Sequence, residues 1–79
     1  MCQPSDEFEY FLKTLGKNIN KVRKNINLSQ EQLAFNIDSA RNYIGCIERA
    51  EKVASLKTLF KIAKVLNTTV EDLLKNTME

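Results

Sequence analysis

Two short helices joined by a tight turn are predicted over residues 28–49, and this segment constrains the fold more than any other part of the chain. Ser29 is a natural N-cap for the first of these helices, and Gln32 stands where it can complete a capping box. Leu28 can pack onto Leu33 across the first turn. The spacing therefore predicts a helix that begins directly after Ser29.

The two helices are expected to cross closely. Leu33, Ala34 and Ile37 form one apolar face of the first helix, and the small side chain of Ala34 permits close approach. The second helix is expected to follow Asp38 and Ser39. In that second helix Ile44 and Ile47 are predicted to point inward, whereas Arg41, Asn42, Gly45 and Cys46 point elsewhere.

A long helix is predicted before this pair, from about Asp6 to Lys24. Ser5 is its expected N-cap, and Asn27 is expected to end it in the left-handed conformation, with Asn25 as a second candidate. Apolar residues recur at alternating steps of four and three and form one stripe: Phe8, Leu12, Leu15, Ile19, Val22 and Ile26.

Two more helices are predicted after residue 50. Ser55 is expected to start the first, and Thr69 to start a short last one, with Asp72 completing a capping box. Their predicted inward positions are Leu56, Leu59, Phe60, Ala63 and Leu66, then Val70, Leu73 and Leu74. With no strand pattern, the sequence predicts an all-α fold, a compact bundle of five helices.

The composition limits the class of protein. A chain of 79 residues, 43% of them hydrophobic, suits one domain over residues 1–79 with a modest core. Two cysteines, Cys2 and Cys46, are too few for a disulfide scaffold and favour the reducing cytoplasm. Neither a membrane-spanning run nor a signal-peptide pattern is present, so we expect a soluble cytoplasmic protein.

Catalytic chemistry has no matching pattern in this sequence. The chain contains no His, no glycine-rich phosphate loop and no cysteines at metal-ligand spacing. No pair of carboxylates falls in a recognisable cleft pattern. We therefore expect a protein that is not an enzyme and that uses no metal, cofactor or small-molecule ligand.

The charge is small overall but unevenly distributed. The formal net charge is +2, to which residues 17–29 contribute +4 and residues 53–66 contribute +3. Residues 1–16 and 67–79 each contribute −2. Basic segments thus flank the two-helix unit, as a DNA-facing surface requires, although solvated helix faces also carry lysine and charge alone leaves both interpretations open.

A set of motifs spread over roughly residues 13–75 carries a family resemblance. The motifs are Leu28-Ser-Gln-Glu-Gln-Leu-Ala34, Arg41-Asn-Tyr-Ile44, Ile47-Glu-Arg49, Ser55-Leu-Lys-Thr-Leu59, Ile62-Ala-Lys-Val-Leu66 and Val70-Glu-Asp-Leu-Leu74. Together they resemble the lambda-repressor/Cro-like (XRE-type) helix-turn-helix family. The resemblance implies that the second and third helices, at about residues 29–49, form the DNA reader, and that homodimers bind inverted repeats.

The resemblance also implies which residues contact DNA. Arg41 is placed to pair with guanine and Asn42 with adenine in the major groove. The full base-reading set is Ala40, Arg41, Asn42 and Cys46, and the phosphate-contacting set is Gln30, Tyr43, Arg49, Lys52 and Lys57. These assignments have open alternatives. Arg41, Asn42 and Cys46 can be ordinary surface residues, Gln30 can be a capping-turn residue without a phosphate contact, and Tyr43 can pack across the helix pair.

Arg23 and Glu48 are expected to form a structural ion pair. Arg23 follows Ile19 by four residues and Glu48 follows Ile44 by four, so both border an apolar stripe. In the family that this sequence resembles, the matching positions form a partly buried pair between the first helix and the end of the third. The resemblance therefore implies a structural role for Arg23, not base reading.

Several positions depart from the family pattern. Asp38 and Ala50 stand where glycine is common, and Ser39 replaces an apolar residue and offers an alternative N-cap. Gly45 and Cys46 leave the middle of the predicted reading helix with short side chains. These departures leave the predicted fold intact, and the short side chains of Gly45 and Cys46 are the reason to keep an antitoxin-like or protein-interaction module as the alternative function.

The leading prediction is a sequence-specific regulator of transcription that binds double-stranded DNA as a homodimer. The predicted dimer surface lies on the C-terminal helices, and its residues are Phe60, Leu66, Val70, Leu73 and Leu74. The alternative is that all five close the core. Phe8, Tyr10 and Phe11, on an N-terminal extension over residues 1–12, form a second candidate surface.

Overall fold

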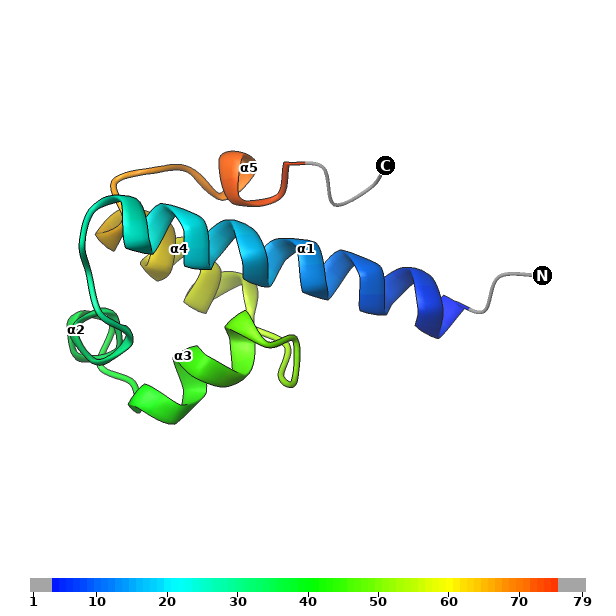
Figure 1. Cartoon of the computed structure of the whole chain (residues 1–79), viewed down its shortest axis with the longest axis horizontal. Helices are drawn as coiled ribbons and strands as arrows, with labels where there is room; N and C mark the ends of the chain where they lie inside the picture. Colours follow the sequence, from blue (N-terminus) through cyan, green and yellow to red (C-terminus); the bar gives the residue numbers. More distant parts are fainter. Residues whose placement is uncertain (1–3, 76–79) are drawn as a thin grey trace.

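The computed structural model describes residues 4–75, with side chains from residue 7 onward, and this range contains five helices and no strand. In chain order they are α1 (Pro4–Asn25), α2 (Gln30–Asn36), α3 (Arg41–Glu48), α4 (Leu56–Val65) and α5 (Val70–Leu73), as Figure 1 shows. The predicted all-α fold with five helices is confirmed. None of these helices is long and apolar enough to cross a membrane.

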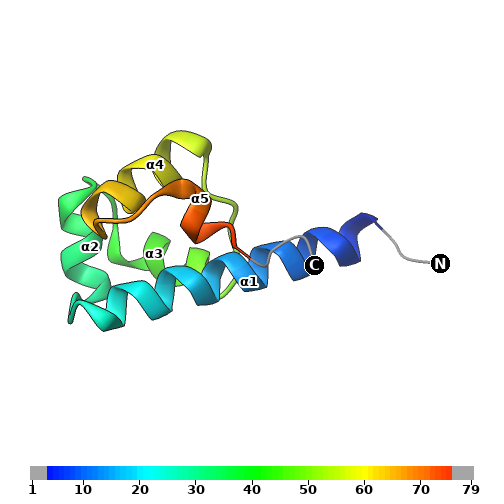
Figure 2. The same cartoon turned by 90° about the horizontal axis from the view of Figure 1, so that it is seen from above.

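α1 runs along the length of the molecule, and the other four helices lie beside its C-terminal part (Figures 1 and 2). α3 and α5 pack directly on α1, whereas α4 packs on α2 and α5. In Figure 1, α3 and α5 lie on opposite sides of α1, α4 lies behind it, and α2 closes one end. The N-terminal part of α1 projects beyond the other helices (Figure 2), in keeping with molecular extents of 41 × 22 × 20 Å.

One hydrophobic core is enclosed between the helices. Its members are Leu15, Ile19, Leu33, Ala34, Ile37, Ile44, Ile47, Leu59, Ile62, Ala63, Leu66 and Leu73. Each of the five helices contributes at least one residue to this cluster. Ile37 and Leu66, the C-cap residues of α2 and α4, also belong to it. Removal of apolar surface from water contributes about 25 cal/mol per Å², so the shared core is the main force that holds the helices together.

Four predicted core residues lie at the surface instead. Phe8 is 47% exposed because it lies on the projecting part of α1, and Ile26 is 45% exposed because it follows the last helical residue. On α4, Leu56 is 74% exposed and Phe60 is 56% exposed. Both lie at the border of the stripe that the core covers, so the expectation that they point inward is wrong.

Side-chain caps start three of the helices. Ser29 accepts a hydrogen bond from the Gln32 backbone at 3.0 Å and donates its own backbone N–H to the Gln32 side chain at 2.8 Å, which is the predicted capping box. Ser55 and Thr69 likewise cap α4 and α5. Thr69 accepts a hydrogen bond from the Asp72 backbone, but the Asp72 side chain accepts from the Thr68 hydroxyl and not from the Thr69 backbone. The predicted second capping box is therefore wrong.

Two predicted helix starts also differ from the structure. α1 begins at Pro4, so Ser5 lies inside the helix and is not its N-cap. Proline suits the first turn because the N–H that it lacks has no helical partner there. The N-cap of α3 is Ala40, whose side chain offers no cap, and the alternative start at Ser39 is wrong.

Four helices end in the same way, and none uses glycine. Asn27, Asp38, Ala50 and Asn67 have φ values of 58°, 58°, 63° and 58°, in the left-handed region. In each case the following residue donates its N–H to a carbonyl five residues earlier, as Leu28 does to Arg23 at 3.0 Å. This is the Schellman motif, and it confirms the predicted stop at Asn27.

α5 has only four residues and is held to α1 from outside. Asn18 of α1 donates from Nδ2 to the carbonyl oxygens of Leu73 at 2.8 Å and Lys75 at 2.9 Å. The Leu73 side chain is completely buried in the core. A helix this short is unstable alone, so these contacts fix it in place.

Candidate nucleic-acid interface

The first turn of α3 presents polar side chains to solvent. Ala40, Arg41 and Asn42 are exposed, and the side chains of Arg41 and Asn42 form no hydrogen bond or ion pair within the part of the chain that the structure describes. Ala34, which is 2% exposed, lies in the core between the two helices. Ile44 and Ile47 thus anchor α3 in the core, while the N-terminal end of the helix faces solvent.

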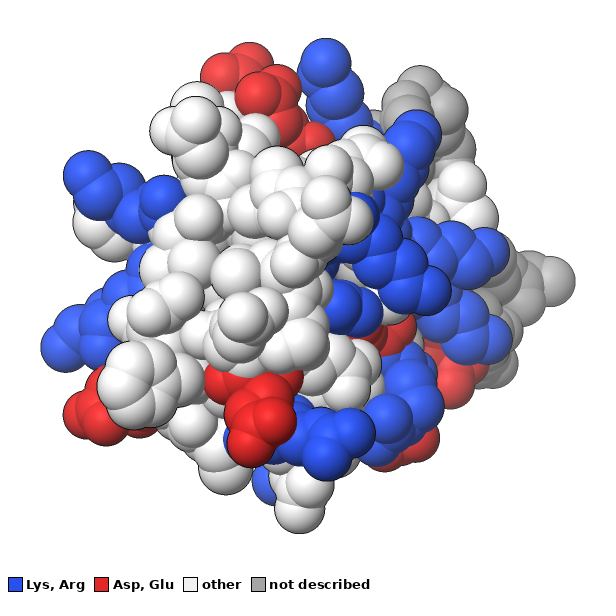
Figure 3. Space-filling model, turned by 60° about the vertical axis from the view of Figure 1, so that its left-hand side comes forward, with Lys and Arg blue, Asp and Glu red and all other residues white. Residues whose placement is uncertain are grey.

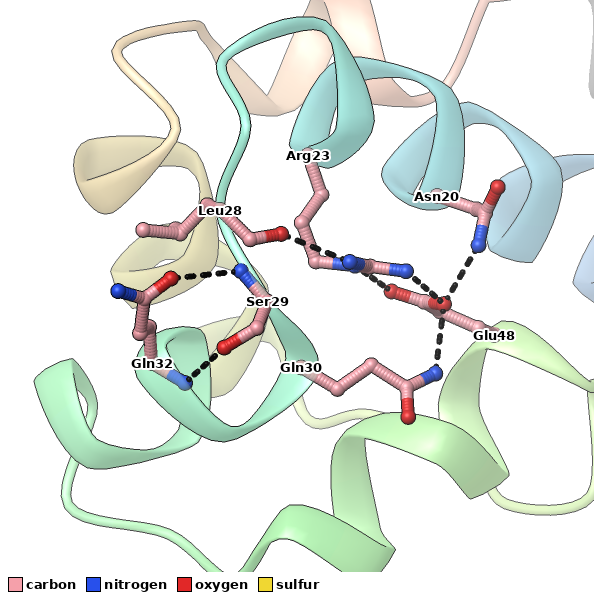
Figure 4. Close-up of polar contacts among 7 residues, drawn as sticks. All are labelled: Asn20, Arg23, Leu28, Ser29, Gln30, Gln32 and Glu48. Atoms are coloured by element: carbon pink, nitrogen blue, oxygen red, sulfur yellow. Dashed lines mark hydrogen bonds and ion pairs between the residues drawn. The ribbon is translucent and has the colours of Figure 1, made fainter.

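The opposite end of α3 is fixed by the carboxylate of Glu48 (Figure 4). Arg23 of α1 donates to this carboxylate from Nε at 2.7 Å and from Nη2 at 3.1 Å. Asn20, also of α1, donates to it from Nδ2 at 2.8 Å. Gln30 of α2 donates at 3.0 Å, while Arg23 Nη1 bonds the Leu28 carbonyl oxygen at 2.7 Å. The side chains of Arg23 and Glu48 are only 8% and 4% exposed.

These hydrogen bonds determine the ionisation of Glu48. Burial alone would raise the pKa of its carboxyl group, but the hydrogen bonds from Arg23, Asn20 and Gln30 outweigh burial and hold the pKa below its ordinary value. The carboxylate therefore stays charged at neutral pH and joins three helices. Gln30 commits one amide N–H to Glu48, which leaves the second N–H of that amide for an external acceptor.

Gly16 allows α1 to lie directly against the end of α3. A Cβ atom at this position would lie 2.9 Å from the backbone carbon of Glu48 and 2.9 Å from the carbonyl oxygen of Ile47. Both atoms belong to backbone, which cannot move aside as a side chain can. The close packing of these two helices therefore requires glycine here.

A second polar cluster lies on the surface of α3. Arg49 donates to Glu51 from Nε at 3.0 Å and from Nη2 at 3.2 Å, and Nη2 is 3.8 Å from Sγ of Cys46. The paired hydrogen bonds raise the pKa of Arg49 and lower that of Glu51. A Cβ at Gly45 would lie 2.9 Å from Nη1 of Arg49. Gly45 is thus buried beneath this guanidinium group, and its predicted outward position is wrong.

The remaining predicted contact residues surround the start and end of α3. Tyr43 is half-buried and packs against the core, while Cys46 is half-buried beside Arg49. Lys52 is exposed in the loop after α3, and Lys57 is exposed in the first turn of α4. Figure 3 turns the α2 end of the molecule forward, and there lysine and arginine side chains gather along the right-hand side.

Sequence reasoning missed three residues of this region: Gly16, Asn20 and Glu51. Gly16, Asn20 and Arg23 follow one another at i, i+4 and i+7, which places them along one side of α1. That spacing was the available signal for the surface that contacts α3. Glu51 had no such signal, because its pairing with Arg49 depends on the left-handed turn at Ala50.

Known proteins are similar to this chain in sequence. The pattern of the helix-turn-helix family matches residues 19–73. Control protein C.SmaI of Serratia marcescens is 48% identical over 60 residues, which cover 76% of this chain and 71% of that protein. Control protein C.BamHI of Bacillus amyloliquefaciens is 42% identical over 60 residues, covering 75% and 74%.

A solved structure of a controller protein is similar to this chain in fold. The crystal structure of the restriction-modification controller protein C.AhdI from Aeromonas hydrophila has a TM-score of 0.76 and 34% sequence identity. The match covers 78% of this chain and 94% of that chain. The chain therefore belongs to the XRE-type helix-turn-helix family of DNA-binding transcriptional regulators.

Proposed function

We propose that this protein is a controller-type transcriptional regulator that binds an inverted repeat in double-stranded DNA as a homodimer. The observation that carries the proposal is the division of α3 into an exposed first turn and an immobilised last turn. Arg41 and Asn42 project into solvent, while Glu48 is bonded to two other helices. A helix held in this way presents its N-terminal side chains to the major groove in a fixed orientation.

The proposed base contacts depend on two side chains. Arg41 donates two hydrogen bonds to guanine O6 and N7, and Asn42 pairs with adenine N6 and N7. Ala40 and Cys46 contribute short-range contacts beside them. The proposed phosphate contacts come from Gln30, Tyr43, Arg49, Lys52 and Lys57, and they set the register of α3 on the duplex.

The proposed dimer surface is smaller than the sequence suggested. Leu66 is 2% exposed and Leu73 is completely buried, so both belong to the core and are not available to a partner. Phe60 is 56% exposed and lines a shallow groove with Ala63 and Val70. We place the contact with a second copy around Phe60, where α4 and α5 meet.

The relatives support the proposed regulatory role. Two of them are control proteins and a third is a restriction-modification controller, so the genes of such a system are the proposed targets. Regulation through protein concentration suits a small dimer, since a dimeric species forms only as its concentration rises.

Selection from random duplex DNA, followed by a salt titration on the enriched sequence, tests this function. We expect an inverted repeat and an affinity that falls steeply with salt. Arg41→Ala should cost about 1–3 kcal/mol and relax the preference at one base pair, whereas Lys52→Ala should weaken binding to all sequences alike. An equal reduction in affinity on every sequence for Arg41→Ala would contradict the assigned base contact.

One observation favours the second candidate, a protein-interaction module on the same fold. Phe35 of α2 is 83% exposed, and it lines a shallow groove with Leu28 and Gln32. Apolar side chains that gather at an exposed groove are typical of a surface that contacts protein. Failure to enrich any DNA sequence, together with weak binding to all duplexes, would make this candidate the leading one.

A further inference from the structure

Four lysines form one row along α1: Lys13, Lys17, Lys21 and Lys24. At about 100° of rotation per residue, they fall within an arc of about 80° of the helix surface. All four side chains are exposed, and none forms an ion pair with another residue of the described range. We call this set the α1 lysine row.

The stability of α1 explains only the ends of the row, where Lys24 lies in the last turn and Glu9 precedes Lys13 by four residues. Lys13, Lys17 and Lys21 follow one another at a spacing of four, at which like charges repel and destabilise a helix. The acidic residues Glu7 and Glu9 precede the row and do not interrupt it. Four unpaired cations on one face are therefore complementary to an external polyanion.

The row has a fixed position relative to α3. Gly16 and Asn20, which contact the end of α3, lie about a quarter of a turn around α1 from the middle of the row. The row is thus beside the α3-facing side of α1 and away from the buried Leu15 and Ile19. It extends over roughly 16 Å at about 1.5 Å per residue, a length over which duplex DNA presents several phosphates.

We propose that the α1 lysine row binds the phosphate backbone of the operator duplex outside the segment that α3 reads. The proposal rests on the proposed DNA-binding function and adds a contact that carries no base information. It predicts that affinity depends on the length of DNA flanking the inverted repeat.

The test compares two double variants in which the same amount of charge is removed. Lys17→Gln with Lys21→Gln removes two lysines of the row, and Lys61→Gln with Lys75→Gln removes two exposed lysines elsewhere. Lys61 lies beside Phe60 of the proposed dimer surface, so sedimentation first verifies that both variants dimerise like the wild-type protein. Affinity is measured by fluorescence anisotropy at several salt concentrations. One duplex ends at the selected site, and the other extends beyond it by about one and a half helical turns on each side.

We expect the wild-type protein and the Lys61/Lys75 variant to bind the long duplex more tightly than the short one. The Lys17/Lys21 variant should bind both duplexes alike, and on the long duplex its salt slope should fall by about 0.9 for each phosphate that it no longer neutralises. Equal affinity of the wild-type protein for both duplexes, or equally weakened binding by the two variants, would overturn the proposal. Absence of sequence preference in the wild-type protein would instead contradict the proposed function, since length-dependent binding needs no preferred sequence.

Discussion

At the scale of single residues, Glu48 is the position where the smallest change has the largest expected effect. Its side chain is 4% exposed and bonds to Arg23, Asn20 and Gln30. Glu48→Ala leaves the buried guanidinium of Arg23 uncompensated, so the free energy of unfolding should fall by about 3–5 kcal/mol. Urea denaturation followed by circular dichroism measures this decrease. Glu51→Ala, at an exposed ion pair, is the control and should leave the midpoint unchanged; a Glu48→Ala midpoint equal to wild type would refute the structural role.

The same carboxylate predicts a dependence of stability on pH. Because the pKa of Glu48 in the folded protein lies below the ordinary value of 4.5, the folded state binds fewer protons than the unfolded state in acid. The contribution of Glu48 is complete above about pH 4.5 and is lost as the pH falls through the lower folded value. The difference in unfolding free energy between wild type and Glu48→Gln should therefore shrink below that pH. A difference that stays constant from neutral pH down to acid would show that Glu48 does not titrate in this way.

The two glycines predict opposite results for the same substitution. Gly16→Ala brings a methyl group against the backbone of Glu48 and Ile47 and should lower the free energy of unfolding by about 1–3 kcal/mol. The methyl group of Gly45→Ala meets only the guanidinium of Arg49, which can move, and alanine favours the helix by roughly 1 kcal/mol. Gly45→Ala should therefore raise the free energy of unfolding. Thermal melts of the two variants, compared side by side, check this contrast. Equal destabilisation by both would mean that the contact at Gly16 is not decisive.

Interactions within one helix could be read from the sequence at this scale, but those that depend on a turn could not. The capping box of Ser29 and Gln32 needs only local geometry, and it formed as predicted. Arg49 and Glu51 are two residues apart, a spacing at which helical side chains do not meet. Only the left-handed conformation of Ala50 brings them together, and alanine gives no sign of such a conformation.

At the scale of the helix, the four left-handed stops lead to a prediction about Ala50. An L-residue in this conformation costs about 1–2 kcal/mol, whereas glycine costs roughly 0.5–1 kcal/mol in chain entropy. Ala50→Gly should therefore raise the free energy of unfolding by about 0.5–1 kcal/mol. Asn67→Gly is the matched control and should change it less, because asparagine tolerates φ near 58°. Chemical denaturation measures the stabilities of both variants. A decrease in stability for Ala50→Gly would contradict the expected relief of strain at this position.

Helix positions were predictable to within a few residues, but the width of each buried face was not. Leu59, Ala63 and Leu66 of the α4 region are buried as expected. Leu56 and Phe60 share their spacing with these residues and yet lie outside the area that the other helices cover. Periodicity locates the middle of an apolar face, whereas its edges depend on how the neighbouring helices cross, which no local pattern contains.

At the scale of the whole molecule, Phe60 predicts how the protein associates. Since its ring is 56% exposed at the proposed dimer surface, Phe60→Ser should shift the monomer–dimer equilibrium toward monomer while the circular dichroism spectrum stays unchanged. Phe35→Ser, which removes another exposed ring, should leave association as it is. Analytical ultracentrifugation over a range of concentrations distinguishes the two. Dissociation by Phe35→Ser alone would move the interface to α2.

The separation of the two ends of α3 has a consequence for reprogramming this protein toward new targets. The side chains that hold α3 in place are the buried Ile44, Ile47 and Glu48. Arg41 and Asn42 are exposed and take no part in holding it. A combinatorial library confined to positions 41 and 42 would therefore sample new sequence preferences without lowering the stability of the scaffold. Such a library would yield mostly folded proteins, and selection could then act on target choice alone.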